Sequence, residues 1–146
     1  MNEIEELPIK NYKMPVEKKQ IYIVDDDVSV RRSLKLLMIS YGFEVETFSS
    51  AEEFLSDVRN IAPGCLILDI HMEGLNGWDT LQRLTEAGST HSVIVITADK
   101  DEAFKEKALK AGAVGFLQKT FEDHYLLHMV TRVFSGEIYD KQKSIK

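Results

Sequence analysis

The chain has 146 residues, which is the length of one domain at roughly 150 residues per domain. Its 18 basic and 24 acidic residues give a formal net charge of −6, which argues against a general nucleic-acid or membrane-surface binder, because both use a basic face. One cysteine excludes a disulfide framework, and the absence of any run of roughly 18 apolar residues and of a signal peptide predicts a soluble, cytoplasmic protein.

Residues 1–19 are predicted to form an N-terminal tail, because they contain two prolines and no sustained hydrophobic period. From Gln20 onward, short apolar runs alternate with amphipathic stretches. The apolar runs at 21–24, at 65–70 (interrupted by the charge of Asp69) and at 93–97 are typical of strands that are buried on both faces. Residues 43–48 and 113–117 predict two shorter strands.

A segment with helical spacing of apolar residues follows each predicted strand. The first of these helices ends at Gly42, the second begins at a capping box formed by Ser50 and Glu53, and the last spans about 121–134. Five strand–helix units in tandem predict an α/β fold, with a parallel sheet covered by helices on both faces. Residues 137–146 are predicted to be a polar C-terminal tail.

The predicted strands carry charged and polar residues at their carboxyl ends, the edge where doubly wound sheets bind ligands. These residues are Asp25, Asp26 and Asp27 after the first strand, Asp69 after the third, Thr97 after the fourth and Lys119 after the fifth. Neighbouring carboxylates repel one another, so the group favours a bound cation, and oxygen ligands favour a hard ion such as Mg²⁺. The lysine and the threonine hydroxyl are suited to an anion such as a phosphoryl group.

Some of the residues also have an ordinary structural explanation. Asp27 by itself is equally compatible with capping the helix that follows it. His124 and His128 are one helical turn apart, but they lack a third zinc ligand and are expected to be surface or half-buried residues. Cys65 opens a buried strand and is expected to be inert packing.

Seven short motifs occur together in one order along the chain. They are Val24-Asp25-Asp26, Leu68-Asp69, Met72, Gly77, Ile96-Thr97-Ala98, Phe116 and Lys119. In this order they resemble the receiver domain of bacterial two-component response regulators. Within that family, the sequence most resembles the nitrogen-fixation-type branch. The resemblance covers residues 20–136 and implies a flavodoxin-like, doubly wound sheet of five parallel strands in the order 2-1-3-4-5, with five helices.

The resemblance also implies a role for each residue of the acidic edge. Asp69 would be the phosphoacceptor, which attacks the phosphorus of a phosphohistidine. Lys119 and Thr97 would contact phosphoryl oxygens, and Phe116 would turn inward when Thr97 moves. Mg²⁺ would be held by Asp25, Asp26, Asp69 and the backbone carbonyl of His71.

The partners implied by the resemblance are a sensor histidine kinase or phosphotransfer domain upstream and an unidentified protein target downstream. We expect no direct contact with nucleic acid or membrane, and a dimer that forms on phosphorylation. The chain would be a signalling switch rather than an enzyme, catalysing only its own phosphoryl transfer and slow autodephosphorylation. Because few residues follow Lys119, it is expected to act without an output domain of its own.

The sequence departs from the family pattern at two positions. Glu73 stands where the family usually has proline, and Thr120 follows Lys119 where the family has proline after a cis peptide bond. A cis bond before a residue other than proline costs about 2.5–4 kcal/mol, so we expect the Lys119–Thr120 peptide bond to be trans.

Two alternatives remain open at this point. A small haloacid-dehalogenase-type phosphatase would use Asp25 as its nucleophile and Asp27 beside it, but Asp69 would then have no role. A pseudo-receiver would bind partners without phosphorylation. It is disfavoured because every residue of the phosphoacceptor pattern is present.

Overall fold

The computed structural model describes residues 19–57, 61–72, 74 and 76–136. Residues 1–18 and 137–146, which make up nearly all of the two predicted tails, and Glu73 lie outside the described residues. The described strands form one parallel sheet in the order β2-β1-β3-β4-β5, as predicted. They are β1 (Gln20–Val24), β2 (Glu44–Phe48), β3 (Cys65–Asp69), β4 (Ser92–Thr97) and β5 (Gly115–Gln118).

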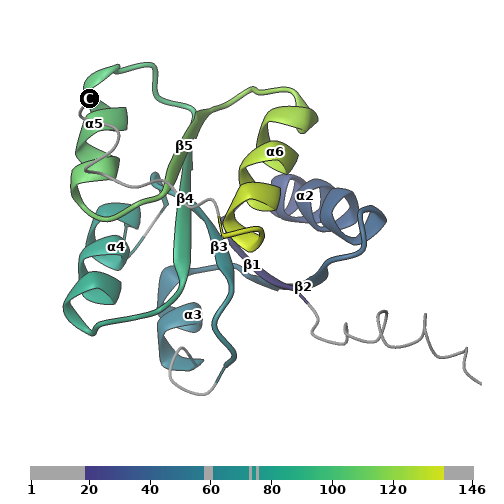
Figure 1. Ribbon diagram of the computed structural model, residues 1–146. Helices are drawn as coiled ribbons and strands as arrows, with labels where there is room; N and C mark the ends of the chain where they lie inside the picture. Colours follow the sequence, from purple (N-terminus) through teal and green to yellow (C-terminus); the bar gives the residue numbers. More distant parts are fainter. Residues whose placement is uncertain (1–18, 58–60, 73, 75, 137–146) are drawn as a thin grey trace, which may run out of the picture.

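Helices cover both faces of this sheet. Within the described residues they are α2 (Val28–Ser40), α3 (Ala51–Asp57), α4 (Gly77–Glu86), α5 (Ala103–Lys110) and α6 (Asp123–Phe134). Helices α2 and α6 lie on one side of the sheet, and α3, α4 and α5 lie on the other (Figure 1). This three-layer arrangement is the predicted one. None of the described helices combines the length and the apolar character that crossing a membrane requires.

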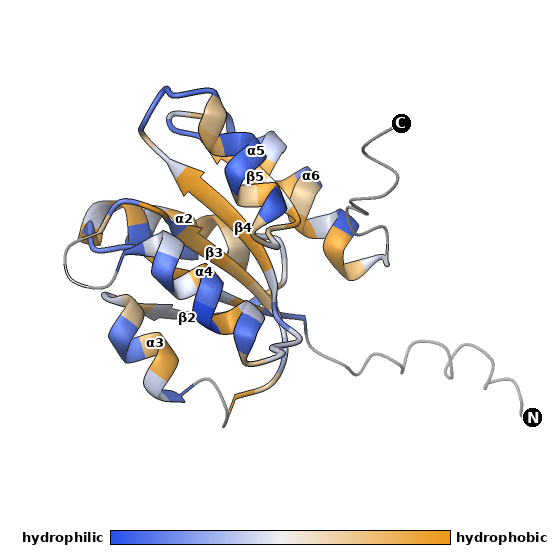
Figure 2. Ribbon diagram, turned by 90° about the vertical axis from the view of Figure 1, so that its left-hand side faces the viewer, coloured by the Kyte–Doolittle hydropathy of each residue, from blue (hydrophilic) through white to orange (hydrophobic). Residues whose placement is uncertain are grey.

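Alternate residues of each central strand supply two separate cores. In β1, Ile21 and Ile23 pack with Leu34 of α2 on one face, whereas Tyr22 and Val24 pack against the α3–α4–α5 side. Figure 2 shows the strands as largely hydrophobic and the helices as mixed. A strand that is buried on both faces needs apolar residues at every position, which explains the continuous runs in the sequence. Burying each such side chain contributes about 1.5–3 kcal/mol.

The contacts at the helix N-termini largely match those predicted from the sequence, with differences at Glu53 and at the start of α6. The Asp27 carboxylate accepts hydrogen bonds from the backbone of Ser29 (2.8 Å) and Val30 (3.3 Å), so this residue caps α2. Ser50 Oγ accepts from the Glu53 backbone as expected, but the Glu53 carboxylate bonds to Ser49 rather than to Ser50. Helix α6 begins at Asp123, two residues later than predicted, because Glu122 is the N-cap with an extended backbone; Phe121 before it packs against the α2–α6 core.

The single cysteine is part of the core. Cys65 is fully buried, and burial raises the pKa of its thiol to about 12. The thiol therefore stays protonated at neutral pH and is a poor nucleophile. The expectation that Cys65 packs in the core is confirmed.

A half-buried histidine lies near the amino end of β4, away from the acidic edge. The His91 ring contacts the rings of Tyr22 (5.4 Å between centroids) and Phe54 (5.7 Å). Its Nδ1 is 3.0 Å from Ser89 Oγ, while Nε2 makes no hydrogen bond to any described residue. Burial lowers the pKa of His91, and the backbone carbonyl of Ala62 offsets part of this effect.

The lowered pKa of His91 predicts that acidification destabilises the fold. As pH falls through the usual histidine range, the unfolded chain takes up a proton at this residue before the folded chain does, so stability falls. Chemical denaturation between about pH 7.5 and pH 5.5 measures the slope of the free energy of unfolding against pH. We expect His91→Phe to flatten it, whereas His128→Gln, at an exposed position on α6, leaves it as in the parent. An unchanged slope in His91→Phe would contradict this assignment.

Candidate functional site

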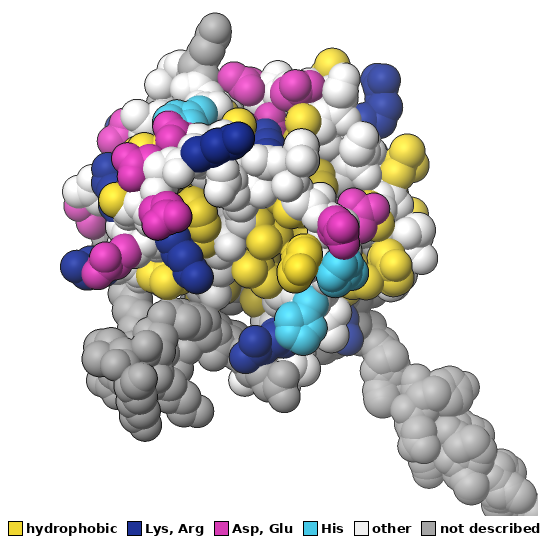
Figure 3. Space-filling model, turned by 90° about the horizontal axis from the view of Figure 1, so that it is seen from above, with side chains coloured by type: hydrophobic (Ala, Val, Ile, Leu, Met, Phe, Trp, Pro, Cys, Tyr) yellow, Lys and Arg dark blue, Asp and Glu magenta, His cyan; other side chains and the backbone are white. Residues whose placement is uncertain are grey.

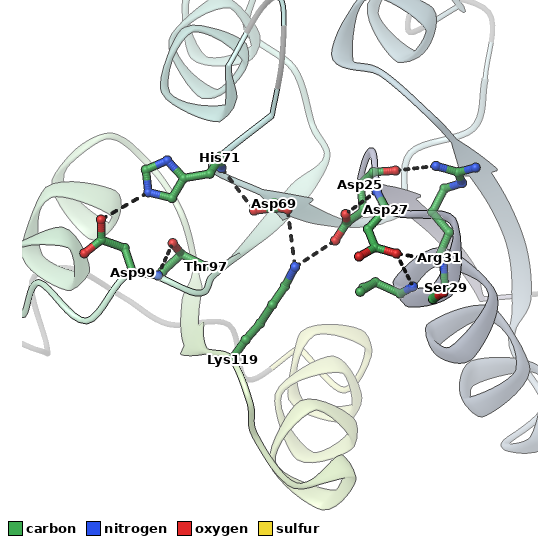
Figure 4. A network of polar contacts seen from close by, with 10 residues as sticks. Asp25, Asp27, Ser29, Arg31, Asp69, His71, Thr97, Asp99 and Lys119 are labelled. Atoms are coloured by element: carbon green, nitrogen blue, oxygen red, sulfur yellow. Dashed lines mark hydrogen bonds and ion pairs between the residues drawn. The ribbon is translucent and has the colours of Figure 1, made fainter.

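Parallel strands bring the predicted residues to one edge of the sheet. Asp25 follows β1, Asp69 ends β3, Thr97 ends β4 and Lys119 follows β5. Seen from above, this end of the molecule carries several acidic side chains on its surface (Figure 3), and the close-up shows the Lys119 side chain reaching toward Asp25 and Asp69 (Figure 4). The parallel topology therefore assembles residues that lie far apart in the sequence.

Lys119 bridges two buried carboxylates. Its Nζ is 3.1 Å from Asp25 Oδ2 and 3.3 Å from Asp69 Oδ2. The Asp25 side chain is fully buried, and those of Asp69 and Lys119 are 7% and 19% exposed. Charges this close interact strongly where little water is present to screen them. The site therefore holds a fixed ammonium group directly beside the side chain of Asp69.

The pKa shifts follow from this geometry. Burial raises the pKa of Asp25, the charge of Asp69 raises it further, and the Asp27 amide and Lys119 pull it down in part. Burial by itself lowers the pKa of Lys119, but the charges of Asp25 and Asp69 outweigh it, so the net pKa lies above the usual value. The lysine therefore remains charged at neutral pH and balances part of the buried negative charge.

Three carboxylates can converge on one cation. Asp25, Asp26 and Asp69 each offer an oxygen atom, and these atoms lie within 4.8 Å of one another. Asp26 is exposed, while the other two are buried. A donor set made only of oxygen fits Mg²⁺, which keeps some of its water ligands and therefore needs an open side such as the one at Asp26. The residues present fit the predicted metal.

Two backbone contacts fix the direction of the buried carboxylates. The amide of Asp27 donates to Asp25 Oδ1 (2.9 Å), and the amide of His71 donates to Asp69 Oδ1 (3.0 Å). Arg31 Nη1 donates to the backbone carbonyl of Asp25 (2.7 Å). This contact of Arg31 was not predicted from the sequence. The sequence feature that could have pointed to it is a basic residue on the first turns of a helix that follows an acidic run.

The loop after β3 passes close to the start of α4. The backbone amide of Gly77 donates to the carbonyl of Ile70 (3.0 Å), and a Cβ atom at Gly77 would lie 2.9 Å from the carbonyl oxygen of Asp69. Only glycine leaves room for this approach without moving the backbone that carries Asp69.

Thr97 ends β4 as predicted, and Phe116 lies in β5. Thr97 is fully buried, and its Oγ1 accepts a hydrogen bond from the Asp99 amide (3.0 Å). Phe116 is half-buried against the α3–α4–α5 core. His71 presents its side chain to Asp99, with 3.4 Å between Nε2 and Oδ2. That pairing was not predicted, because it joins two loops that are distant in sequence.

The expectation for the Lys119–Thr120 peptide bond is wrong, because the bond is cis. The expectation used only the intrinsic preference of a peptide bond before threonine. It did not include the tertiary contacts of Lys119, whose ammonium group lies between two carboxylates from other strands.

Comparison with known proteins gives consistent matches. The family model described as "Response regulator receiver domain" matches residues 21–131. The chain is 45% identical over 107 residues to response regulator protein TmoT of Ectopseudomonas mendocina, covering 73% of this chain and 49% of that protein. It is 38% identical over 113 residues to transcriptional regulatory protein FixJ of Bradyrhizobium diazoefficiens, covering 77% and 55%.

A solved structure matches in the same region. Full-length FixJ from B. japonicum superimposes with a TM-score of 0.76 at 36% identity, over 81% of this chain and 58% of that one. The chain thus spans about half the length of the curated relatives it matches.

Proposed function

The chain belongs to the response regulator receiver domain family, and we propose that it accepts a phosphoryl group on Asp69 and switches conformation in response. Receiver domains of this family are signalling switches of two-component systems. The family match does not favour the haloacid-dehalogenase-type phosphatase, and the capping role of Asp27 removes one of its two aspartates from the site.

One observation carries the proposal: Lys119 Nζ lies 3.3 Å from Asp69 Oδ2, inside a largely buried acidic site. An oxygen of the Asp69 carboxylate would attack the phosphorus of a phosphohistidine, forming a P–O bond. The P–N bond would break, and the imidazole would leave with the electron pair and take up a proton. Lys119 would stabilise the charge on the transferring oxygens.

Mg²⁺ would be held by Asp25, Asp26, Asp69 and the backbone carbonyl of His71. When bound, it supplies positive charge that stabilises the phosphoryl oxygens. The contacts of Asp25 with the Asp27 amide and of Asp69 with the His71 amide leave the remaining carboxylate oxygens to the lysine and the cation. Slow autodephosphorylation by water completes the cycle.

The switch would use Thr97 and Phe116. A phosphoryl group adds roughly −1.5 to −2 charge, which attracts the hydroxyl of Thr97. Movement of Thr97 would let Phe116 turn inward and change the surface of α5, β5 and α6. A phosphoryl group biases two conformations only through its different interactions with them.

The upstream partner would be a histidine kinase or a phosphotransfer domain, and the downstream partner a protein target, with dimerisation on phosphorylation. Matched relatives are named as transcriptional regulatory proteins, and the match covers 55% of FixJ. Output without contact to nucleic acid therefore stays a prediction.

The phosphoryl transfer is tested by incubating the protein with acetyl phosphate and Mg²⁺ and measuring its intact mass. We expect the gain of one phosphoryl group. A mass that stays unchanged with every donor tried would contradict the proposed function.

Mg²⁺ is expected to raise the melting temperature in the absence of any phosphoryl donor. At a concentration about ten times its Kd, a ligand stabilises by about 1.4 kcal/mol, or roughly 3–5 °C for a protein of this size. Asp26→Asn should remove this response, because it removes one oxygen ligand. The matched control is Asp27→Asn, which retains the helix cap and should respond like the parent. Equal shifts in both variants would contradict the ligand assignment.

A further inference from the structure

Asp99, in the loop between β4 and α5, is bonded to three different segments. Its backbone amide donates to Thr97 Oγ1 (3.0 Å). Its Oδ1 accepts from the Asp101 amide (2.9 Å), and its Oδ2 lies 3.4 Å from His71 Nε2. Figure 4 shows Asp99 between His71 and Thr97. One residue thus links the end of β4, through its backbone amide, to the loop that follows the proposed phosphoacceptor, through its carboxylate.

Contacts continue from Asp99 to α5 by two routes. Along the backbone, the Asp101 carboxylate accepts from the amide of Ala103, the first residue of α5 (2.9 Å). Through the side chains, the His71 ring contacts the Phe104 ring, with 5.9 Å between centroids. Both routes therefore reach the first turn of α5.

Trp78 lies at the end of the second route. The Phe104 ring packs edge-on against the Trp78 ring of α4, with centroids 5.5 Å apart. Lys107 of α5 places its Nζ 4.2 Å from the centroid of the same indole ring. Trp78 is the only tryptophan of the chain, so its fluorescence reports on the contact between α4 and α5.

We propose that Asp99 is a positioning residue that couples the Thr97 hydroxyl to His71 and to the first turn of α5, so that phosphorylation of Asp69 changes the environment of Trp78. The proposal rests on the proposed function. A displacement of Thr97 Oγ1 toward Asp69 either draws the Asp99 amide with it or breaks their hydrogen bond. In the first case the carboxylate of Asp99 shifts relative to His71 and Asp101, and in the second the Asp99 backbone loses the hydrogen bond that holds it at the end of β4.

The exposure of the pair indicates positioning rather than stability. The side chains of His71 and Asp99 are 52% and 39% exposed, and exposed ion pairs contribute little to stability. Removing the Asp99 carboxylate should therefore affect the response to phosphorylation more than the melting temperature. If Asp99 had only a structural role, its removal would lower the melting temperature more than it changes the response to phosphorylation.

The experiment follows intact mass and Trp78 fluorescence in parallel as acetyl phosphate and Mg²⁺ are added. We expect the parent to gain a phosphoryl group and to change its emission. Asp99→Ala should still be phosphorylated, with the change in emission reduced about twofold or more, as expected when one link of a coupled network is removed. Asp99→Asn keeps the Oδ1 acceptor and a polar group toward His71, and should restore the response. Lys100→Ala, at an exposed neighbour in the same loop, is the matched control.

The two readouts separate the two proposals. A parent protein that gains no phosphoryl group overturns the proposed function. A parent that is phosphorylated with unchanged emission, or an Asp99→Ala variant that is phosphorylated with the full change, overturns the role of Asp99. If Asp99→Ala fails to fold, His71→Phe provides the test, because it keeps an aromatic ring beside Phe104 but loses the contact with Asp99. A full emission change in that variant would equally overturn the proposal.

Discussion

Asp69→Asn is expected to abolish phosphoryl uptake. An amide oxygen carries no negative charge and is a poor nucleophile, so the variant cannot form the acyl phosphate. Its size and the hydrogen bond from the His71 amide to Oδ1 are retained, so the fold should be preserved. The measurement is intact mass after incubation with acetyl phosphate and Mg²⁺, followed by peptide mapping of the parent to locate the modified residue.

Peptide mapping also separates the proposal from its alternatives. Asp27→Asn is the matched control, because this neighbouring aspartate caps α2, and it should be labelled like the parent. A phosphoryl group that is still gained by Asp69→Asn, or that maps to Asp25 in the parent, would contradict the assignment. Label on Asp25 would instead favour the phosphatase chemistry that uses the first aspartate.

Lys119→Met is expected to have the largest effect on stability. It leaves the buried carboxylates of Asp25 and Asp69 without their shared cation, and breaking a buried ion pair on one side costs about 3 kcal/mol, or roughly 10 °C in melting temperature. The pKa of Asp25, already raised mainly by burial, would rise further. The folded state would then bind a proton more readily than the unfolded chain. The loss of stability in Lys119→Met relative to the parent should therefore shrink as pH falls and grow as pH rises.

Mg²⁺ and a charge-conserving variant provide the controls for Lys119→Met. Mg²⁺ should stabilise this variant more than the parent, because the cation replaces part of the lost positive charge. Lys119→Arg keeps the charge and should lose less stability. Phosphoryl uptake should slow in Lys119→Met, since the transferring oxygens lose an ammonium partner. If Lys119→Met and the parent have the same melting temperature when both are measured without Mg²⁺, the bridging role of Lys119 is contradicted.

The sequence by itself determined the sheet and the edge where the site lies. The run 65–68 is apolar at every position, which is typical of a strand covered on both sides, and a tandem of strand–helix units makes such strands parallel. Parallel strands end at one edge, so Asp25, Asp69 and Lys119 could be predicted to meet there. This part of the prediction depends only on hydrophobic periodicity and chain direction.

The tertiary structure decided how these groups are paired. Whether Asp27 faces the site or caps α2, and which loop residue pairs with His71, depends on distances between segments that periodicity does not encode. The cis bond at Lys119–Thr120 likewise contradicts the local preference of the sequence, which does not encode the contacts of Lys119 with two other strands. Local sequence fixes backbone propensities of a few kcal/mol, whereas contacts between charged groups on different strands arise only once the fold brings them together.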